Sequence, residues 1–391
     1  MDLTQITYTN VTEVFSADSI EETMEEDLEE CRVIPSLKTI QAWRFWLSGV
    51  FTLCTGLLGI AGNIVSLVIL TKKLMRNVFT LLLSSLCVAD LIFLVSNLVL
   101  APSSLGYKPA LLTSLAAFSE AGSHLGLALS IFLTVAVTLE RYQSISDPLN
   151  YEARVVSRGR TNLVLIYLIP SILLSIVFNI PRLLSVSSLG TSLHTNQQLV
   201  RIYIFYQAVH PLSTTGLIPF LFLSILNWRI NNKIPKISHV SSSSRRRTKD
   251  FNLARVCTIL VLVFLVLNLP RLTVGLYEVS SIGTILRCYS NNLKYYTPTW
   301  QWCADSVARY LAVVNSSINF LIYCLAGSQF RSELKKTLGM CRGSQSSPVT
   351  NSFSLRSIRR RSSFSTGLNS SLNQSSRRNR IGVNCPKIKI W

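Results

Sequence analysis

Seven runs of apolar residues constrain the fold of this chain more than any other feature of its sequence. A helix needs roughly 20 apolar residues to cross about 30 Å of hydrocarbon. Only 15% of the 391 residues are charged, whereas soluble domains are richer in charge. The pattern therefore predicts an all-α membrane protein, a seven-transmembrane helix bundle. The predicted spans are 46–70, 78–101, 115–139, 162–181, 202–228, 253–278 and 304–326.

The charged residues predict how the bundle is oriented. Ten of the 19 acidic residues lie within residues 1–30, whereas basic residues follow the first, third, fifth and seventh spans. Because Lys and Arg mark the cytoplasmic side, residues 1–45 are expected to form an acidic extracellular segment of a multi-pass plasma-membrane protein. The net charge of +19 comes from inner loops and a tail, so topology explains it and we expect no nucleic-acid partner.

The part of the chain after the last span divides in two. After the membrane domain, 46–327, residues 328–340 are expected to form a short amphipathic eighth helix on the inner membrane surface, in contact with lipid. Residues 341–391 are basic and rich in serine, a composition that predicts a disordered cytoplasmic tail. Cys341 is placed either for palmitoylation, as a second membrane tether, or as a plain free cysteine.

The outer side carries candidate covalent modifications. Asn10 begins an Asn-Val-Thr sequon and is a predicted glycosylation site. Cys31, Cys288 and Cys303 face the oxidising side, where a disulfide can form. Cys288 with Cys303 is the preferred pair, and Cys31 with either of them is the alternative, since sequence does not fix connectivity.

Asp90 lies in the middle of the second span, where an ionisable side chain is costly unless it faces protein or water. Ser130, Asn315 and Asn319 are polar residues of the third and seventh spans. One carboxylate with several neutral oxygens suits a small hard cation such as sodium. The alternative is a hydrogen-bond network that joins the helices. No other cofactor is expected.

Glu140, Arg141 and Tyr142 stand at the inner end of the third span. Glu140 can neutralise Arg141 there, and Asp250 lies at the inner end of the sixth span, about 30 Å along the helix from Pro270. A pair between Arg141 and Asp250 would hold two helix ends together, and its breakage would open a cavity for a cytosolic partner. The alternative is that both side chains meet lipid phosphates.

Polar and aromatic residues also gather at the outer ends of the spans. They could line an outward-facing cleft that contacts a ligand, or the charges could simply pair with one another, for example Glu120 with Arg271. The candidates are Glu120, His124, Arg271, Tyr277, Glu278, Trp302, Asp305, Arg309 and Tyr310.

Over about residues 40–340 the chain resembles the rhodopsin-like G-protein-coupled receptors. The matching residues, in order, are Gly62-Asn63, Leu86-Cys-Val-Ala-Asp90, Glu140-Arg141-Tyr142, Pro219, Phe264 with Pro270, and Asn319 with Tyr323. The resemblance implies a receptor rather than an enzyme, with a heterotrimeric G protein, arrestin and receptor kinases as partners. It assigns Glu140, Arg141, Tyr142, Asp250 and Tyr323 to the coupling switch.

More narrowly, the chain is similar to the invertebrate FMRFamide-receptor-like neuropeptide receptors. The strings that carry this likeness are Arg76-Asn-Val-Phe79, Asn179-Ile-Pro-Arg182, Leu267-Asn-Leu-Pro-Arg-Leu272, Leu276-Tyr-Glu278 and Val314-Asn-Ser-Ser-Ile-Asn-Phe-Leu-Ile-Tyr323. The likeness implies a short cationic peptide ligand ending in Arg-Phe-amide, whose arginine pairs with Glu120, Glu278 or Asp305. A non-peptide receptor of the same fold and a secondary transporter are the alternatives.

The chain departs from the family pattern at several positions. Ala116 stands where a cysteine usually opens the third span, and residues 182–201 contain no cysteine. The usual outer disulfide is therefore absent. Asn268 replaces the tryptophan before the sixth-span proline, Phe320 replaces the seventh-span proline and Asn227 replaces the fifth-span tyrosine.

Overall fold

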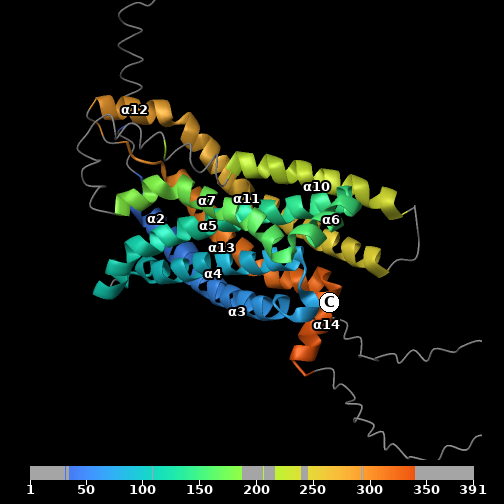
Figure 1. Cartoon of the computed structure of the whole chain (residues 1–391). Helices are drawn as coiled ribbons and strands as arrows, with labels where there is room; N and C mark the ends of the chain where they lie inside the picture. Colours follow the sequence, from blue (N-terminus) through green and yellow to red (C-terminus); the bar gives the residue numbers. More distant parts are fainter. Residues whose placement is uncertain are drawn as a thin grey trace, which may run out of the picture. The chain divides into compact units, whose positions relative to one another are not determined.

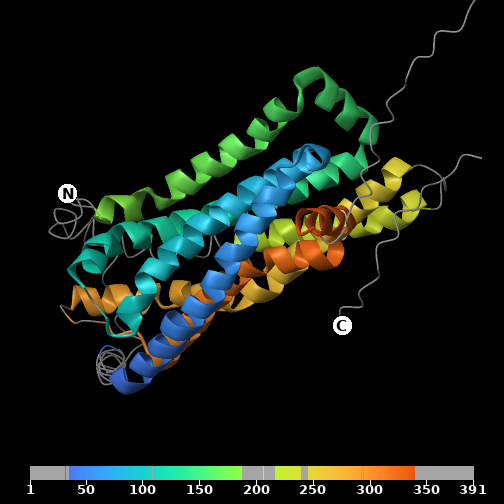
Figure 2. The same cartoon turned by 90° about the horizontal axis from the view of Figure 1, so that it is seen from below.

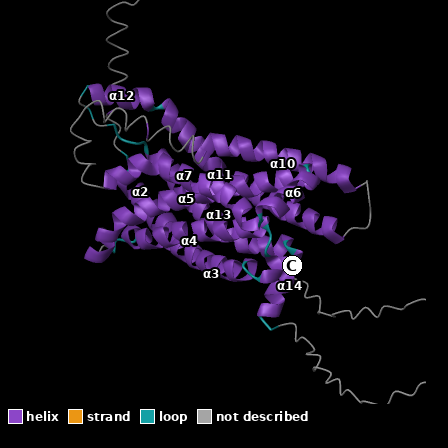
Figure 3. Cartoon of the chain, viewed as in Figure 1, coloured by secondary structure: helices purple, strands orange, loops and turns teal. Residues whose placement is uncertain are grey.

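The computed structural model describes residues 31, 35–107, 109–186, 206, 216–238, 245–291, 293 and 295–339, with side chains at all of these except 113, 181–186, 234–238 and 245–251. Within this part of the chain every regular element is a helix (Figures 1 and 3). The predicted all-α class is confirmed.

The described residues form thirteen helical segments. Their bounds are α2 (Leu37–Trp43), η1 (Arg44–Phe51), α3 (Thr52–Leu70), η2 (Lys73–Met75), α4 (Val78–Ser104), α5 (Ala110–Ser146), α6 (Pro148–Arg158), α7 (Arg160–Val186), α10 (Leu217–Ser238), α11 (Arg245–Ser280), α12 (Ile282–Ser290), α13 (Thr299–Ala326) and α14 (Ser328–Thr337).

Six helical segments among the described residues are long and apolar enough to cross a membrane. They correspond to the first, second, third, fourth, sixth and seventh predicted spans. Much of the fifth predicted span, 202–228, lies outside the described residues, and α10 covers its second part. The protein is a multi-pass membrane protein, while the outward position of its amino terminus stays a prediction.

The observed helices are longer than the apolar runs that predicted them. The third span was expected over 115–139, whereas α5 extends over Ala110–Ser146. The first was expected to begin at residue 46, whereas α2 and the π-helical segment η1 continue α3 back to Leu37. A transmembrane helix can continue beyond the hydrocarbon layer, because polar side chains are tolerated outside that layer. Apolar runs therefore underestimate helix length.

The helices pack into one bundle with α4 and α5 near its centre (Figures 1 and 2). α4 packs against α3 and α5, α5 also packs against α7 and α10, and α13 packs against α3 and α11. The outward faces are apolar, with Leu58, Val266 and Leu325 at 76%, 69% and 73% exposed. Such a surface fits hydrocarbon rather than water.

Polar and small residues hold the helices close together. Asn63 of α3 donates its amide hydrogens to Gly59 O at 2.9 Å and to Ser316 O of α13 at 2.8 Å. At Gly126 of α5, an added Cβ would lie 2.7 Å from the backbone nitrogen of Phe93 in α4. A larger residue there would separate the two central helices, and small residues are the usual means of close packing in membranes.

By its internal contacts the chain divides into two units, Met1–Arg331 and Ser332–Trp391. The eighth helix was expected over 328–340, and α14 is helical over Ser328–Thr337. Its place on the inner membrane surface stays a prediction. Asn10 and the whole of the tail, 341–391, with Cys341 in it, lie outside the described residues.

Candidate functional site

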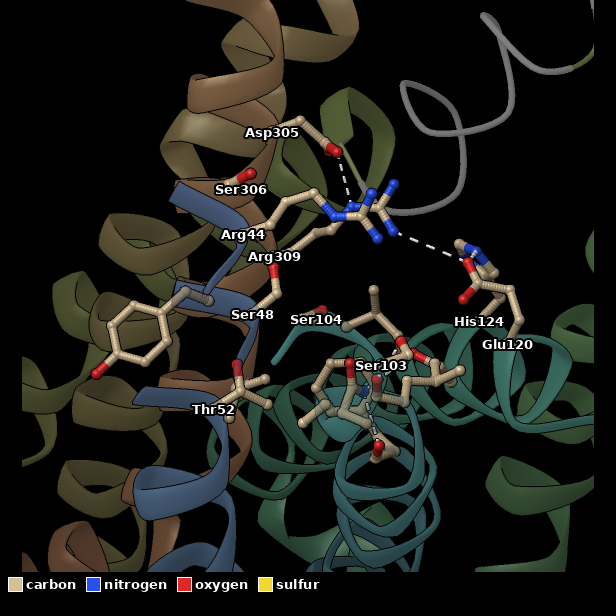
Figure 4. A pocket seen from close by; sticks show the side chains of 18 of the residues that line it. Arg44, Ser48, Thr52, Ser103, Ser104, Glu120, His124, Asp305, Ser306 and Arg309 are labelled. Carbon is tan, nitrogen blue, oxygen red and sulfur yellow. Dashed lines mark hydrogen bonds and ion pairs between the residues drawn. The ribbon is translucent and has the colours of Figure 1, made fainter. Parts of the chain in front are cut away.

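A cavity of about 270 Å³ lies at the end of the bundle that the charge pattern assigns to the outside, which we call the outer end. It lies between η1 and α3, α4, α5, α11 and α13 (Figure 4). We call it the outer pocket. Its lining residues are Arg44, Ser48, Thr52, Phe93, Asn97, Leu100, Ala101, Ser103, Ser104, Glu120, Ser123, His124, Leu127, Arg271, Trp302, Asp305, Ser306, Arg309, Tyr310 and Val313.

The structure brings together most of the residues that the sequence proposed for ligand contact. Those that line the outer pocket are Glu120, His124, Arg271, Trp302, Asp305, Arg309 and Tyr310. Tyr277 and Glu278 are not among its lining residues, although Glu278 interacts electrostatically with Arg309, so their contact with a ligand stays a prediction. They lie on α11 about 10 Å beyond Arg271 along the helix axis. Tyr277 instead packs edge-on against Trp300, with ring centroids 4.5 Å apart.

Arg309 of α13 links the acidic side chains of the pocket. Its Nε donates to Asp305 Oδ2 at 2.7 Å, and its Nη1 lies 3.8 Å from Glu120 Oε1. Glu120 Oε1 also lies 3.1 Å from His124 Nε2, as expected for residues four apart on one helix. The carboxylates of Asp305 and Glu120 therefore already have a cationic or polar neighbour inside the protein. The Glu120–Arg271 pair stays a prediction.

Sequence reasoning missed the part of the pocket that the first two spans provide. Arg44 and Ser48 belong to η1, one turn apart, and Figure 4 shows both side chains on the pocket side. Arg44 precedes the apolar run that was expected to begin at 46. The sequence feature that could have identified Arg44 is a basic residue just before the first span, on the side of the acidic amino-terminal segment.

The base of the pocket ties α4 to α5. Asn97 Nδ2 donates to Phe93 O at 2.8 Å and to Ser123 Oγ at 3.0 Å. This bridge fixes the two helices next to Glu120 and His124, which follow one turn apart on α5. Ligand contacts at the outer pocket can therefore act directly on the packing of the two central helices.

The disulfide joins Cys31 to Cys288, with Cα atoms 5.9 Å apart. The preferred Cys288–Cys303 pair is therefore wrong and the alternative with Cys31 is correct. Cys303 is a free cysteine in α13. The preferred pair rested on closeness in sequence, but a disulfide depends on Cα separation in space. The bond ties the segment before α2 to α12.

Asp90 is fully buried and accepts two hydrogen bonds. Ser130 Oγ donates to Oδ1 and Asn319 Nδ2 donates to Oδ2, both at 2.7 Å. Asn315, Ser130 and Asn319 line an adjacent cavity of about 10 Å³, room for about one water molecule. Asp90 itself is not among the residues that line this cavity, and it adjoins them through its hydrogen bonds to Ser130 and Asn319. These bonds form a hydrogen-bond network that joins α4, α5 and α13, and a sodium ion at this place stays a prediction.

Glu140 and Arg141 form a buried pair at the opposite, inner end. Arg141 Nε donates to Glu140 Oε2 at 2.6 Å and Nη2 donates to Oε1 at 2.5 Å. Glu140 is 0% and Arg141 3% exposed. The guanidinium carbon also lies 4.6 Å from the centre of the Phe79 ring. Arg141 is therefore bonded to its neighbour on the same helix, as the sequence predicted.

Tyr151 is a third member of this cluster that sequence reasoning missed. It lies on α6, whose start is set by Pro148 and by Asp147, whose Oδ1 accepts a hydrogen bond from Asn150 N at 3.3 Å. Its hydroxyl donates to Glu140 Oε1. Burial first, and the Glu140 carboxylate second, raise the pKa of Tyr151 above its ordinary value of 10.0. The phenol therefore stays protonated and donating at neutral pH.

The other predicted switch residues lie apart from this cluster. Tyr142 faces away, with Lys233 Nζ 5.3 Å from its ring centre. Tyr323 is buried in α13 and packs on Phe330, with ring centroids 5.6 Å apart. The side chain of Asp250 lies outside the described residues, so its pairing with Arg141 stays a prediction.

Two of the departures from the family pattern have a local structural outcome. Asn268, in place of tryptophan, is buried and donates its amide to Phe264 O at 2.9 Å one turn back. Phe320, in place of proline, leaves α13 a continuous helix and packs edge-on against Phe330. The carboxamide of Asn268 is smaller than the indole of a tryptophan and is bonded to its own helix. The side-chain contacts of α11 at this position therefore differ from those that a tryptophan would make.

Comparison with known proteins agrees with this arrangement. Residues 62–323 match the family described as 7 transmembrane receptor (rhodopsin family). The FMRFamide receptor of Drosophila melanogaster is 27% identical over 73% of this chain and 53% of its own length. The chain thus spans about half the length of that relative.

Two further relatives are more distant. A probable G-protein coupled receptor of Caenorhabditis elegans is 25% identical over 71% of this chain and 66% of its own length. The B1 bradykinin receptor of Macaca fascicularis is 24% identical over 78% of this chain and 85% of its own length. The family match covers well over half of the chain. The chain therefore belongs to the rhodopsin family of seven-transmembrane receptors, whose members are receptors and not enzymes.

Proposed function

We propose that the chain is a plasma-membrane receptor for a short neuropeptide and that it activates heterotrimeric G proteins. The observation that carries the proposal is the outer pocket, a polar cavity of about 270 Å³ with five charged side chains and three aromatic rings, those of Phe93, Trp302 and Tyr310. Charged groups that converge with aromatic rings suit a peptide better than an apolar ligand. Two of the relatives are named as receptors for peptides, FMRFamide and bradykinin.

An FMRFamide-like peptide is the first candidate ligand. Its arginine would pair with Asp305 or Glu120 by taking the place of Arg309, and its aromatic rings would pack on Trp302 and Tyr310. The acidic segment 1–30 would raise the local concentration of such a cation by long-range attraction. This attraction weakens as salt is added.

Coupling would proceed by a shift of population between two states of the bundle. A ligand that binds more tightly when the inner end is open favours that state, with a coupling free energy of about 1–3 kcal/mol typical of linked sites. Release of Arg141 from Glu140 is the inner event. Arrestin and receptor kinases would then act on the inner surface and tail of the activated receptor.

The test is a calcium and cyclic-AMP readout in transfected cells, screened against a panel of neuropeptides that includes FMRFamide-like members. We expect at least one peptide to activate the wild-type receptor and to fail on cells without it. Activation by a small amine or lipid, with silence toward the whole panel, would instead support a non-peptide receptor of the same fold.

We further propose that Asp90 holds a sodium ion in the resting receptor together with Ser130, Asn315 and Asn319. The charge of Asp90 is essential to this proposal, because a neutral carboxamide is a poor ligand for sodium. Asp90→Asn should therefore remove any dependence of agonist binding on sodium, with potassium as the control salt. An unchanged sodium dependence in this variant leaves only the hydrogen-bond network.

A further inference from the structure

The outer pocket carries more positive than negative side chains. Its charged lining consists of Arg44, Arg271 and Arg309 against Glu120 and Asp305, with His124 beside them. Arg309 also interacts electrostatically with Glu278, which lies outside this lining. The arginine that would bind an acidic group of a ligand is therefore identified from the neighbours of each arginine and not from the count of charges.

Arg44 is the arginine that the acidic residues do not reach. Asp305 and Glu120 both lie against Arg309, at 2.7 and 3.8 Å. Among the residues that the structure describes, no carboxylate lies within 4.0 Å of the Arg44 guanidinium. Figure 4 shows Arg44 and Arg309 extending into the same part of the pocket. Arg309 is therefore balanced by Asp305, whereas Arg44 lies beside this pair without a carboxylate of its own among the described residues.

Hydroxyl groups complete the surroundings of Arg44. Ser48 follows it by one turn on the same face, and Ser104 ends α4 across the pocket. Neither hydroxyl has a hydrogen-bond partner within the described part of the protein. Each can therefore donate to an incoming oxygen. One guanidinium and two free hydroxyls are a donor set that matches a carboxylate.

We propose that Arg44 binds a carboxylate of the ligand, beside the Asp305–Arg309 pair and within reach of the Ser48 hydroxyl. The inference rests on the proposed peptide receptor and specifies its ligand: a peptide that contains an anionic group as well as a cationic one. The carboxylate comes either from the carboxyl terminus of the peptide or from an acidic side chain, since both present the same two oxygens.

Two pairs of synthetic probes distinguish these sources. Phe-Met-Arg-Phe as the free acid and as the amide differ only in the terminal group. Asp-Phe-Met-Arg-Phe-amide and Asn-Phe-Met-Arg-Phe-amide differ only in one side-chain carboxylate. The dissociation constant of each is measured on the purified full-length receptor from its thermal stabilisation as peptide concentration rises.

Arg44→Gln is the test variant and Lys38→Gln is its matched control. Both remove one positive charge from exposed positions near the start of the first span, but Lys38 does not line the pocket. We expect the acidic member of at least one probe pair to bind wild type more tightly, by on the order of tenfold, as a charge-assisted hydrogen bond allows. That preference should vanish in Arg44→Gln and persist in Lys38→Gln.

Equal affinity within both probe pairs, including no binding by any probe, overturns the proposal. Equal loss of the preference in Arg44→Gln and Lys38→Gln also overturns it, because the effect would then be general attraction of an anion. This outcome is distinct from failure of the proposed function. A receptor that signals to peptides in cells but shows no acid preference loses only the carboxylate site, whereas cellular silence toward peptides removes the proposed function.

Discussion

Two clusters of charge, at opposite ends of the bundle, have similar bond lengths and different surroundings. At the inner end, Arg141 donates to Glu140 at 2.5–2.6 Å and both are almost fully buried. At the outer end, Arg309 donates to Asp305 at 2.7 Å, but the Arg309 side chain is 52% and the Asp305 side chain 27% exposed.

The difference in burial predicts a difference in energy and in role. Breaking a buried pair leaves a charge without water or partner and costs about 3–5 kcal/mol, whereas an exposed pair contributes about 0.2–1 kcal/mol. The inner pair therefore suits a two-state restraint that changes only when a helix moves. The outer pair suits exchange, because an incoming ligand can replace Arg309 or Asp305 at low cost.

The largest expected effect is at Arg141. Arg141→Ala should reduce G-protein activation more than tenfold, because it removes the positive charge that the open state would present to the G protein. A tenfold loss corresponds to about 1.4 kcal/mol of coupling free energy. Peptide binding should persist. Arg309→Ala is the matched control at the outer end and should keep maximal activation while changing peptide potency. An Arg141→Ala receptor that activates fully would show that the inner pair has no part in coupling.

A disulfide comparison comes next. Cys31→Ser or Cys288→Ser should lower the free energy of unfolding by about 2–5 kcal/mol, because the bond closes a long loop. Cys303→Ser should leave it unchanged. The measurement is thermal stability of the purified receptor together with its amount at the cell surface. A destabilised Cys303→Ser beside a stable Cys31→Ser would restore the rejected pairing.

Tyr151 gives a smaller effect at the inner end. Tyr151→Phe removes a donor to the buried Glu140, at a cost of about 1–3 kcal/mol, and should raise basal signalling severalfold. Tyr167→Phe is the matched control, since its hydroxyl donates to Gln143 at 3.0 Å rather than to Glu140. Because the pKa of Tyr151 is raised above 10.0, its donation is present at neutral pH and lost only at strongly alkaline pH. Basal signalling should therefore show no dependence on this phenol between pH 6 and 8.

Asp305→Asn should have the smallest effect. The exposed pair with Arg309 contributes at most about 1 kcal/mol, so peptide potency should change by less than about fivefold, and less again at high salt. Dose–response curves at two salt concentrations measure this. A loss as large as that of Arg141→Ala would mean that Asp305 is desolvated in the active state, and the contrast between the two ends would fail.

Short-range patterns in the sequence predicted the elements, whereas partners far apart in sequence required the structure. Apolar runs found the helices because crossing hydrocarbon forces every backbone group into internal hydrogen bonds. Glu140 and Arg141 were predicted as a pair because they are neighbours. Tyr151 was missed because it reaches Glu140 only after α6 folds back toward α5.

By itself the sequence determined that this protein is a helical membrane receptor and which polar residues gather at each end of its helices. Only the tertiary structure decided which of them meet. It joined Cys31 to Cys288 across 257 residues, brought Arg44 into the pocket and left Tyr277 and Glu278 out of its lining. The physical reason is that hydrophobicity acts on each segment alone, whereas a pair of charges or thiols acts only over the few ångströms that helix packing sets.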